Sequence, residues 1–317
     1  MNAPLFSRYS PAECRRLFDG QNISPILPYE SSPFNDEESE ADSPGCISVS
    51  GAQEKYSLIT DGHFLRYAKQ GEQGHYMLKP RPHRMKLRTD MPVNEWQSMR
   101  WASELFGLPV AECTLCFYGD GEPAYLVRRF DVKPDGSKRR MEDLAALGNV
   151  LTQENSGSKY EGSYEELASI IARYAIAPRI QLMLFFQYVV VNYLLCNGDA
   201  HMKNFALLEN DTGGMVLAPA YDVMNTRLHV EDSDFALSHG LFANGQPVSR
   251  AGMGAHFLDW AERIGLPRKA AIRYLRKALS QQNKLEQQIH ASLLSRKALH
   301  SYLYHIRERF LRLQKGL

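Results

Sequence analysis

Hydrophobic positions near the front of the chain fall in short runs that are separated by turn residues. Such runs predict strands, and the clearest are Lys55–Ile59 and Tyr76–Lys79. The runs Cys113–Tyr118 and Ala124–Phe130 flank the sequence Gly119-Asp120-Gly121. A glycine-rich turn between two apolar runs predicts a β-hairpin.

Helical spacing first appears at Asn94–Phe106, where large apolar side chains recur every three or four residues before Gly107. Glycine after such a pattern is a common helix stop. The apolar positions are Trp96, Met99, Ala102, Leu105 and Phe106. Further along, the pattern predicts an amphipathic helix at Tyr164–Tyr174 and a buried helix at Ile180–Cys196.

The last part of the chain is almost entirely helical in pattern. A short apolar run at Met215–Leu217 predicts one strand, and from His256 onward helix is interrupted only near Gly265-Leu266-Pro267. The sequence therefore predicts an α+β fold with a small strand-rich lobe, residues 1–130, and a larger all-helical lobe, residues 131–317.

Charge and composition are those of an ordinary globular protein of 317 residues, with 44% hydrophobic and 23% charged positions. The formal net charge of +1 excludes a field over the whole protein that would attract nucleic acid. Residues 31–44 are acidic and predict a mobile loop. The stretch from Arg268 to Lys315 is rich in Lys and Arg, but Glu286, Gln287 and Glu308 are interspersed, which favours a solvated helix face over DNA contact.

The five cysteines form no regular framework, which indicates a reducing compartment. Cys113 and Cys116 lack the second pair that a zinc site requires, so we interpret them as strand residues. Residues 1–19 have no signal-peptide pattern. The apolar stretch Ile180–Cys196 contains polar amides and is short for a membrane span, so we expect a cytoplasmic protein without membrane contact.

The strongest chemical signal follows the predicted buried helix, in the sequence Asn197-Gly198-Asp199-Ala200-His201-Met202-Lys203-Asn204. Protein kinases place an aspartate five residues before an asparagine in the catalytic loop. The aspartate accepts or orients the proton of the substrate hydroxyl, and the asparagine supplies an uncharged oxygen to Mg²⁺. Asp199 and Asn204 have this spacing, and we expect His201 to orient the loop.

Three further signals follow the order of a kinase. Lys79 ends a predicted strand, and Glu95, at the start of the next helix, is a candidate partner for its charge. Asp222, in Tyr221-Asp222-Val223, stands where kinases have a second aspartate that binds Mg²⁺. A turn of small residues, Ser48–Lys55, could present backbone N–H groups to phosphates. Each signal is weak by itself, but their order predicts a kinase-like fold with two lobes that uses ATP and Mg²⁺.

These residues also resemble a known family, the HipA serine/threonine kinase toxins of bacterial toxin–antitoxin systems. The resemblance extends from about Ile47 to the C-terminal helices. The segments that carry it are Ser50–Lys55, Leu78-Lys79-Pro80, Arg129-Phe130-Asp131, Lys159–Tyr164, Gly198–Phe205 and Pro219–Asp222.

The resemblance implies a role for each matching position. Phosphates would be bound by Ser50, Gly51, Ala52, Gln53, Glu54 and Lys55, and ATP would be contacted by Lys79. Adenine would meet the backbone of Arg128, Arg129 and Phe130. Asp199 would accept the proton, and Asn204 and Asp222 would bind Mg²⁺. The nucleotide site would also include His201, Met202, Lys203 and Tyr221. Arg128 stands where the family often has an acidic residue.

The resemblance also implies partners. Because the motifs begin near Ser48, the N-terminal subdomain of full-length HipA is not recognisable, and the chain is more similar to the short HipT branch. The implied substrate is an aminoacyl-tRNA synthetase of the glutamyl or tryptophanyl type. A HipB-like antitoxin and a small HipS-like protein are implied as partners, and nucleic acid would be met only through the antitoxin.

Ser48 and Ser50 flank the predicted phosphate turn. A phosphate on either would add about −1.5 to −2 charges beside the site of the ATP phosphates. We therefore expect inhibitory autophosphorylation at one or both serines, as the family resemblance also suggests.

Two other classes of protein remain open. Small-molecule phosphotransferases of the aminoglycoside or choline kinase type use the same spacing of aspartate and asparagine. A binding module that has lost turnover would be expected to lack Lys79, Asp199, Asn204 or Asp222, and all four are present. A third possibility is that the chain acts as a neutralised or regulatory partner within a toxin complex.

Overall fold

The computed structural model describes residues 8–31, 54–83, 85–148, 156–245 and 252–317, and these form two compact units. The first unit comprises the described residues of Met1–Trp96 and Ala111–Lys138, and the second comprises those of Gln97–Val110 and Arg139–Leu317. Helix α2 (Met91–Glu104) therefore starts in one unit and ends in the other.

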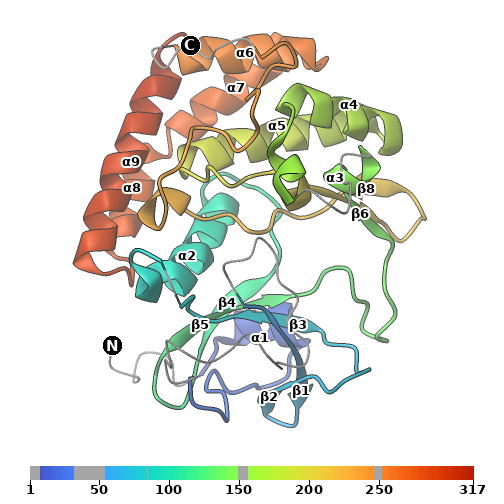
Figure 1. Cartoon of the computed structure of the whole chain (residues 1–317), viewed down its shortest axis with the longest axis vertical. Helices are drawn as coiled ribbons and strands as arrows, with labels where there is room; N and C mark the ends of the chain where they lie inside the picture. The colour runs from blue at the N-terminus through green and yellow to red at the C-terminus, as the bar shows by residue number, and fades with distance from the viewer. Residues whose placement is uncertain (1–7, 32–53, 84, 149–155, 246–251) are drawn as a thin grey trace. The chain divides into compact units, whose positions relative to one another are not determined.

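The first unit is built on an antiparallel sheet with strand order β2-β1-β3-β5-β4 (Figure 1). Its elements are α1 (Pro11–Phe18), β1 (Tyr56–Asp61), β2 (Phe64–Tyr67), β3 (Tyr76–Lys79), a 3-10 turn η2 (Arg88–Asp90), β4 (Cys113–Phe117) and β5 (Pro123–Arg128). The predicted strand Tyr76–Lys79 and the hairpin through Gly119-Asp120-Gly121 are confirmed.

The two faces of this sheet have different surroundings because successive side chains point to opposite faces. Tyr76 and Leu78 of β3 belong to the core that packs against α1. Lys79 follows Leu78 directly in the strand, so it faces the other way. This alternation separates the apolar core of the first unit from the buried Lys79.

Helix α1 is an element that the hydrophobic pattern did not reveal. Ser10 caps its first turn and exchanges hydrogen bonds with Glu13, and Pro11 stands at the first turn. This capping box, with proline just inside the helix, is a start signal that the sequence carried. Leu17 and Phe18 bury the helix against the sheet core.

The second unit is mainly helical and also contains a small antiparallel sheet (Figure 1). Its helices include α3 (Leu144–Leu147), α4 (Tyr164–Tyr174), α5 (Pro178–Leu194), α6 (Met253–Arg263), α7 (Arg268–Leu279), α8 (Gln282–His290) and α9 (Arg296–Gln314). Its 3-10 turns are η3 (Ser156–Tyr160), η4 (Met202–Asn204) and η5 (Thr226–Leu228), and its strands are β6 (Met141–Asp143), β7 (Ala206–Glu209) and β8 (Met215–Leu217).

The prediction of an all-helical second lobe was wrong, because the strands pair in the order β6-β7-β8. Each has only three or four residues. Runs this short contain too few positions to show alternation, and only Met215–Leu217 had been expected. The sheet lies beside the loop that carries Asn204, since the N–H of Leu144, directly after β6, donates to the carbonyl of Phe205.

The predicted helices are present with shifted ends. Tyr164–Tyr174 is confirmed as α4, whereas α2 starts three residues before the expected Asn94. Helix α5 starts at Pro178, and Ile180 is 67% exposed although most of the helix is buried. The terminal helices break at the predicted place before Arg268. None of the helices in the described ranges is long and apolar enough to cross a membrane.

A buried cluster of charges ties α9 to the segment after η5. The Arg309 side chain has no exposed surface, and its guanidinium lies 2.5 Å from the Asp234 carboxylate and 4.6 Å from the centre of the Tyr193 ring. Arg312 also pairs with Asp234. Burial alone would raise the pKa of Asp234, but the two arginines outweigh it and lower the pKa to about 2.

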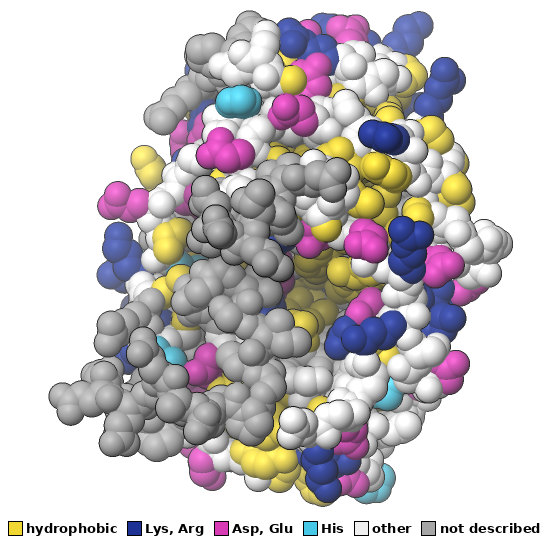
Figure 2. Space-filling view, turned by 45° about the vertical axis from the view of Figure 1, so that its right-hand side comes forward, with side chains coloured by type: hydrophobic (Ala, Val, Ile, Leu, Met, Phe, Trp, Pro, Cys, Tyr) yellow, Lys and Arg dark blue, Asp and Glu magenta, His cyan; other side chains and the backbone are white. Residues whose placement is uncertain are grey.

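Figure 2 shows how charges are distributed on one face. Its Lys and Arg side chains are interspersed with Asp and Glu, and the described residues of this face gather no large field of one sign. This agrees with the formal net charge of +1.

We predict that Asp234→Asn destabilises the second unit by about 3 kcal/mol at pH 7, because it leaves the fully buried Arg309 without its carboxylate, although Arg312 keeps its ion pair with Glu308. Urea unfolding measures this. The folded-state pKa of Asp234 lies below the ordinary value of 3.8, so its contribution is present above that value and is lost as the pH falls towards about 2. The control is Arg307→Gln, which breaks the ion pair of an Arg side chain 55% exposed and should cost under about 1 kcal/mol. Equal effects would contradict the prediction.

Candidate functional site

Asn197 joins three parts of the second unit through its side-chain amide. Its Nδ2 donates to Asn192 Oδ1 of α5 at 2.7 Å and to the backbone carbonyl of Asp222 at 3.0 Å. Its Oδ1 accepts the backbone N–H of Asp199 at 3.3 Å. One buried side chain thus fixes α5, the loop of Asp199 and the loop of Asp222 together.

Asp199 is a partly buried carboxylate with a tyrosine partner. The Tyr160 hydroxyl donates to its Oδ1 at 2.7 Å. Burial raises the pKa of Asp199, the Tyr160 hydroxyl and the charge of Lys159 oppose this, and the Asp232 and Asp222 carboxylates add to it. Since the pKa is raised, the carboxylate form is lost at a higher pH than in an exposed aspartate.

Asn204 and Asp222 lie side by side, as their spacing in the sequence predicted. Asn204 Nδ2 donates to Asp222 Oδ2 at 3.3 Å, and Asn204 Oδ1 is buried without a hydrogen-bond partner among the described residues. Asp222 has a φ of 55°, a left-handed conformation that is unusual outside glycine. Strained backbone of this kind clusters at functional sites.

This pair fits Mg²⁺ in the chemistry of its atoms. Mg²⁺ prefers oxygen ligands and is usually bound by one or two carboxylates together with substrate phosphates. The unpartnered Oδ1 of Asn204 and the carboxylate of Asp222 are such oxygens. No cluster of three His, Cys, Asp or Glu that could hold a metal occurs in the described part of the chain.

The residues between Asp199 and Asn204 make up the body of the loop. His201 is 1% exposed, and burial together with Lys159 lowers its pKa to about 3, so the ring is neutral at pH 7. Its backbone N–H donates to the carbonyl of Asp199, and its carbonyl accepts the N–H of Asn204. Met202 is buried. The Lys203 carbonyl accepts the hydroxyl of Tyr221 at 2.8 Å.

Thr226 binds the backbone at the start of the loop that carries Asp199. Its hydroxyl accepts the N–H of Gly198 at 2.9 Å and lies within hydrogen-bonding distance of the Cys196 carbonyl and the Asp232 carboxylate. A Cβ at Gly198 would lie only 2.3 Å from the Asp232 carboxylate. A side chain at position 198 would therefore displace the Asp232 carboxylate from the Thr226 hydroxyl, so the observed arrangement requires glycine before Asp199.

The first unit contains the predicted lysine–glutamate pair. Lys79 Nζ lies 2.6 Å from Glu95 Oε1, and both side chains are almost fully buried, at 4% and 1% exposure. The ammonium also lies 5.4 Å from the centre of the Tyr125 ring. The structure therefore confirms that β3 and the start of α2 bring these two charges together.

The remaining predicted residues of the first unit are placed as follows. The Arg128 side chain makes a two-pronged salt bridge to Asp19, at 2.8 and 2.9 Å, and Arg129 pairs with Asp131 at 2.5 Å. Phe130 follows in the turn after β5. The arginine side chains are thus engaged by carboxylates, and their backbone N–H groups donate to the carbonyls of Glu112 and His75, both at 2.8 Å. These two N–H groups are therefore not available to adenine as the structure stands.

The predicted phosphate turn is described only at its end. Lys55 is buried, and Glu54 contacts the Tyr56 hydroxyl at 2.5 Å and His83 at 3.5 Å. Outside the described residues lie Ser48, Ser50, Gly51, Ala52 and Gln53, together with most of the predicted acidic loop.

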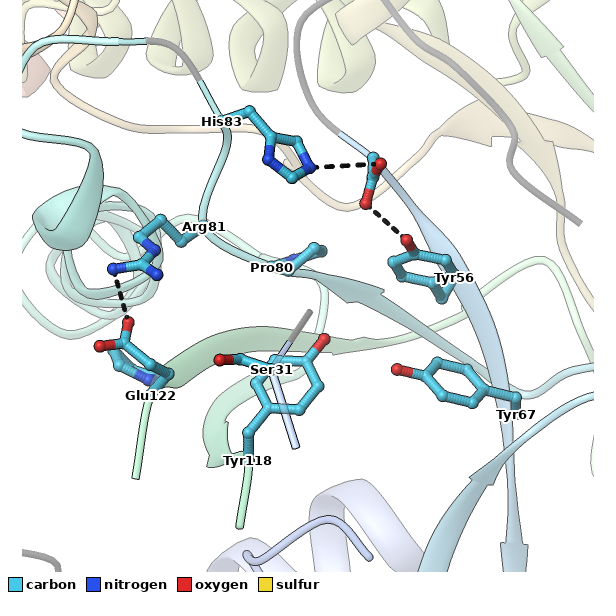
Figure 3. A pocket seen from close by; sticks show the side chains of 10 residues that line it. Ser31, Tyr56, Tyr67, Pro80, Arg81, His83, Tyr118 and Glu122 are labelled. Carbon is cyan, nitrogen blue, oxygen red and sulfur yellow. Dashed lines mark hydrogen bonds and ion pairs between the residues drawn. The ribbon is translucent and has the colours of Figure 1, made fainter. Parts of the chain in front are cut away.

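A pocket in the first unit is lined in part by Glu54 and His83 (Figure 3). Its walls include the rings of Tyr56, Tyr67 and Tyr118, and Arg81 pairs with Glu122 at its rim, at 3.1 Å. Tyr56 stands opposite Leu78 in the sheet, so it shares the face of Leu78 and not that of Lys79. Lys79 is therefore not part of the pocket wall, whereas Glu54, a predicted phosphate contact, is.

The sequence-based reasoning assigned no role to Asn197, Tyr160, Thr226 or Asp232. Tyr160 stands inside a segment that carries the family resemblance, and Asn197 directly precedes another, which was the available signal. Thr226 and Asp232 follow Asp222 within ten residues, and nothing in their spacing indicated contact with the loop.

Comparisons with known proteins show the family and the fold of the chain. The model of the HipA-like C-terminal domain matches residues 47–285. A Haemophilus influenzae protein named "Putative kinase" is 27% identical over 90% of this chain and 86% of its own length.

Two solved structures share the fold. HipA of Shewanella oneidensis, solved with HipB and operator DNA, superimposes with a TM-score of 0.63 at 22% identity, over 86% of this chain and 66% of that one. The Helicobacter pylori proinflammatory kinase CtkA gives 0.54 at 16% identity, over 83% and 91%. The fold is thus a mixed helix-and-strand one of the kind found in HipA and CtkA. The chain belongs to the HipA-like C-terminal domain family.

We predict that Asn197→Asp destabilises the protein by about 3 kcal/mol, because the new carboxylate cannot donate to Asn192 Oδ1 or the Asp222 carbonyl. Urea unfolding at pH 7 measures the loss. Asn210→Asp is the matched control, since the side-chain hydrogen bonds of Asn210 with the described residues are all accepted by its Oδ1, from the N–H groups of Thr212 and Gly214 and the Thr212 hydroxyl. That change should cost under about 1 kcal/mol. Similar losses for both variants would rule out the donating role of Asn197.

Proposed function

We propose that the protein is an ATP- and Mg²⁺-dependent serine/threonine kinase that acts as a toxin in a bacterial toxin–antitoxin system. The observation that carries this proposal is the arrangement of Asp199, Asn204 and Asp222 on two loops fixed by one buried asparagine. Membership of the HipA-like family and the relative named as a kinase support it.

In the proposed reaction, the oxygen of a serine hydroxyl attacks the γ-phosphorus of ATP. The bond between that phosphorus and the bridging oxygen breaks, and ADP leaves. Asp199 accepts the hydroxyl proton. Asn204 Oδ1 and the Asp222 carboxylate would hold Mg²⁺, which neutralises phosphate charge. In the first unit, the buried Lys79 side chain, which is paired with Glu95, would bind phosphate oxygens.

The partners follow from the family. The Shewanella HipA structure contains HipB and operator DNA. By analogy, we propose a HipB-like antitoxin for this chain, contact with DNA only through that antitoxin, and a small HipS-like protein as a further partner. The proposed substrate is an aminoacyl-tRNA synthetase of the glutamyl or tryptophanyl type, whose phosphorylation would inhibit translation.

The proposal includes inhibitory autophosphorylation at Ser48 or Ser50. Both serines lie outside the described residues, so the support is their place in the sequence beside the phosphate turn. A phosphate there would repel those of ATP.

Phosphotransfer tests the proposal directly. Purified protein incubated with ATP, Mg²⁺ and each synthetase should transfer phosphate to a protein serine, and peptide masses should locate it there and at Ser48 or Ser50. Asp199→Asn should lower kcat at least about 100-fold by removing the base, and Asp222→Asn should do the same by weakening Mg²⁺ binding. The control is Asp211→Asn, a change at a side chain 85% exposed, which should transfer at the wild-type rate.

The acceptor separates this proposal from the alternative of a small-molecule phosphotransferase. Phosphate that appears only on an aminoglycoside or choline, and on no protein, would replace the proposal with that alternative. If neither the wild type nor any variant transfers phosphate, and the mass of the purified protein shows that it carries none at the start, a binding module that has lost turnover would be favoured.

Nucleotide affinity tests the role of Lys79. We predict that Lys79→Met raises the Kd for ATP about 10- to 100-fold, because one charge-assisted contact is worth about 1.5–3 kcal/mol. Isothermal titration measures it. Lys69→Met removes the same charge from an exposed position and should leave the Kd unchanged. Equal affinities of the Lys79 variant and wild type would contradict the proposed contact.

A further inference from the structure

Tyr160 is held in place by contacts that leave its hydroxyl directed at Asp199. Its hydroxyl donates to Asp199 Oδ1 at 2.7 Å. Its ring meets the His201 ring edge-on at 5.2 Å, and the Lys159 ammonium lies 4.9 Å from the ring centre. Aromatic and cation–π contacts of this kind fix the orientation of a ring.

The backbone around Tyr160 is fixed as well. Its carbonyl accepts the N–H of Ser238 at 2.8 Å, and the Gly162 carbonyl accepts the N–H of His239 at 2.9 Å. The N–H of Gly162 donates to the Ser238 hydroxyl at 3.1 Å. The chain after Asp222 therefore pairs with the segment of Tyr160, and the tyrosine cannot turn independently of it.

Asp199 uses its two carboxylate oxygens differently. Oδ1 accepts the Tyr160 hydroxyl, whereas Oδ2 accepts no hydrogen bond from the described residues. A base must have one oxygen within reach of the proton it accepts. Oδ2 is the oxygen that remains for a substrate hydroxyl.

We propose that Tyr160 is a positioning residue, which binds one oxygen of Asp199 so that the other faces the hydroxyl to be phosphorylated. This inference rests on the proposed kinase activity and adds the residue that orients its base. A carboxylate on a single-bonded side chain can rotate, and a donor fixed at its ring and backbone removes that freedom. Tyr160 acts through Asp199 and touches neither nucleotide nor substrate.

Tyr160→Phe is a clean test because phenylalanine keeps the ring contacts and the backbone pairing and loses only the hydroxyl. We expect kcat for phosphotransfer to fall about 10- to 100-fold, as for the loss of a hydrogen bond to a charged group. The KM for ATP should stay within about twofold of wild type, since the nucleotide does not contact this hydroxyl. Because partial unfolding would also lower the apparent kcat, the rate is divided by the folded fraction from thermal melting before the variants are compared.

The matched control is Tyr164→Phe. The Tyr164 hydroxyl also donates to this loop, but to the backbone carbonyl of Ala200, at 2.8 Å. We expect this variant to have a lower melting temperature and an unchanged orientation of Asp199.

Crystal structures of wild type, Tyr160→Phe and Tyr164→Phe provide a readout that does not depend on turnover. The Asp199 carboxylate should leave its wild-type rotamer only in Tyr160→Phe. An unchanged rotamer in that variant would overturn the inference even if the wild type is an active kinase. Faster transfer by Tyr160→Phe would also overturn it, because the hydroxyl would then compete with the substrate. If the wild type transfers no phosphate, the proposed function fails, and the rotamer still decides the role of Tyr160.

Discussion

The side-chain amide of Asn197 is the constraint on which the arrangement of the second unit depends. An amide offers donors and an acceptor on one rigid plane. Asn197 uses its donors on α5 and on the loop of Asp222, and its acceptor on the backbone of Asp199. Because these partners come from three separate stretches, any other side chain would leave buried polar groups without a partner. The distance between the candidate base and the candidate metal ligands is therefore determined by one residue.

The residues that contact the loop of Asp199 are in turn connected to the C-terminal helix. Thr226 binds the backbone on both sides of Asn197, at Cys196 and Gly198. Eight residues further on, Asp234 is paired with Arg309 of α9. The C-terminal helix thus stabilises the same segment that supports the loop. Buried charges are unfavourable unless they are paired. Separation of α9 from Asp234 would therefore leave a buried arginine unpaired, and this free-energy cost would add to the loss of apolar contacts.

A contact could be predicted from the sequence when its residues are close along the chain, and could not when they are far apart. The spacing of Asp199, Asn204 and Asp222 was informative because these residues are close in the sequence and lie in two successive loops. Loops that follow one another in the chain can lie side by side, and Asn204 does contact Asp222. The bond from Tyr160 to Asp199 spans 39 residues between two segments without a regular period, so no pattern could indicate it. The strands β6 and β7 were too short to recognise, and they are stabilised by their neighbours more than by their own propensity.

The choice of residue types around Asp199 follows from charge. The Asp222 and Asp232 carboxylates already raise the pKa of Asp199, and a third carboxylate at position 204 would raise it further. Asparagine provides the same kind of oxygen without charge, and His201, whose pKa is lowered to about 3, adds no charge at pH 7. Lys159 is then the nearby cation that opposes the rise in the pKa of Asp199. With more carboxylate than ammonium charge around the loop, the site attracts a cation, which agrees with the metal-dependent reaction proposed for it.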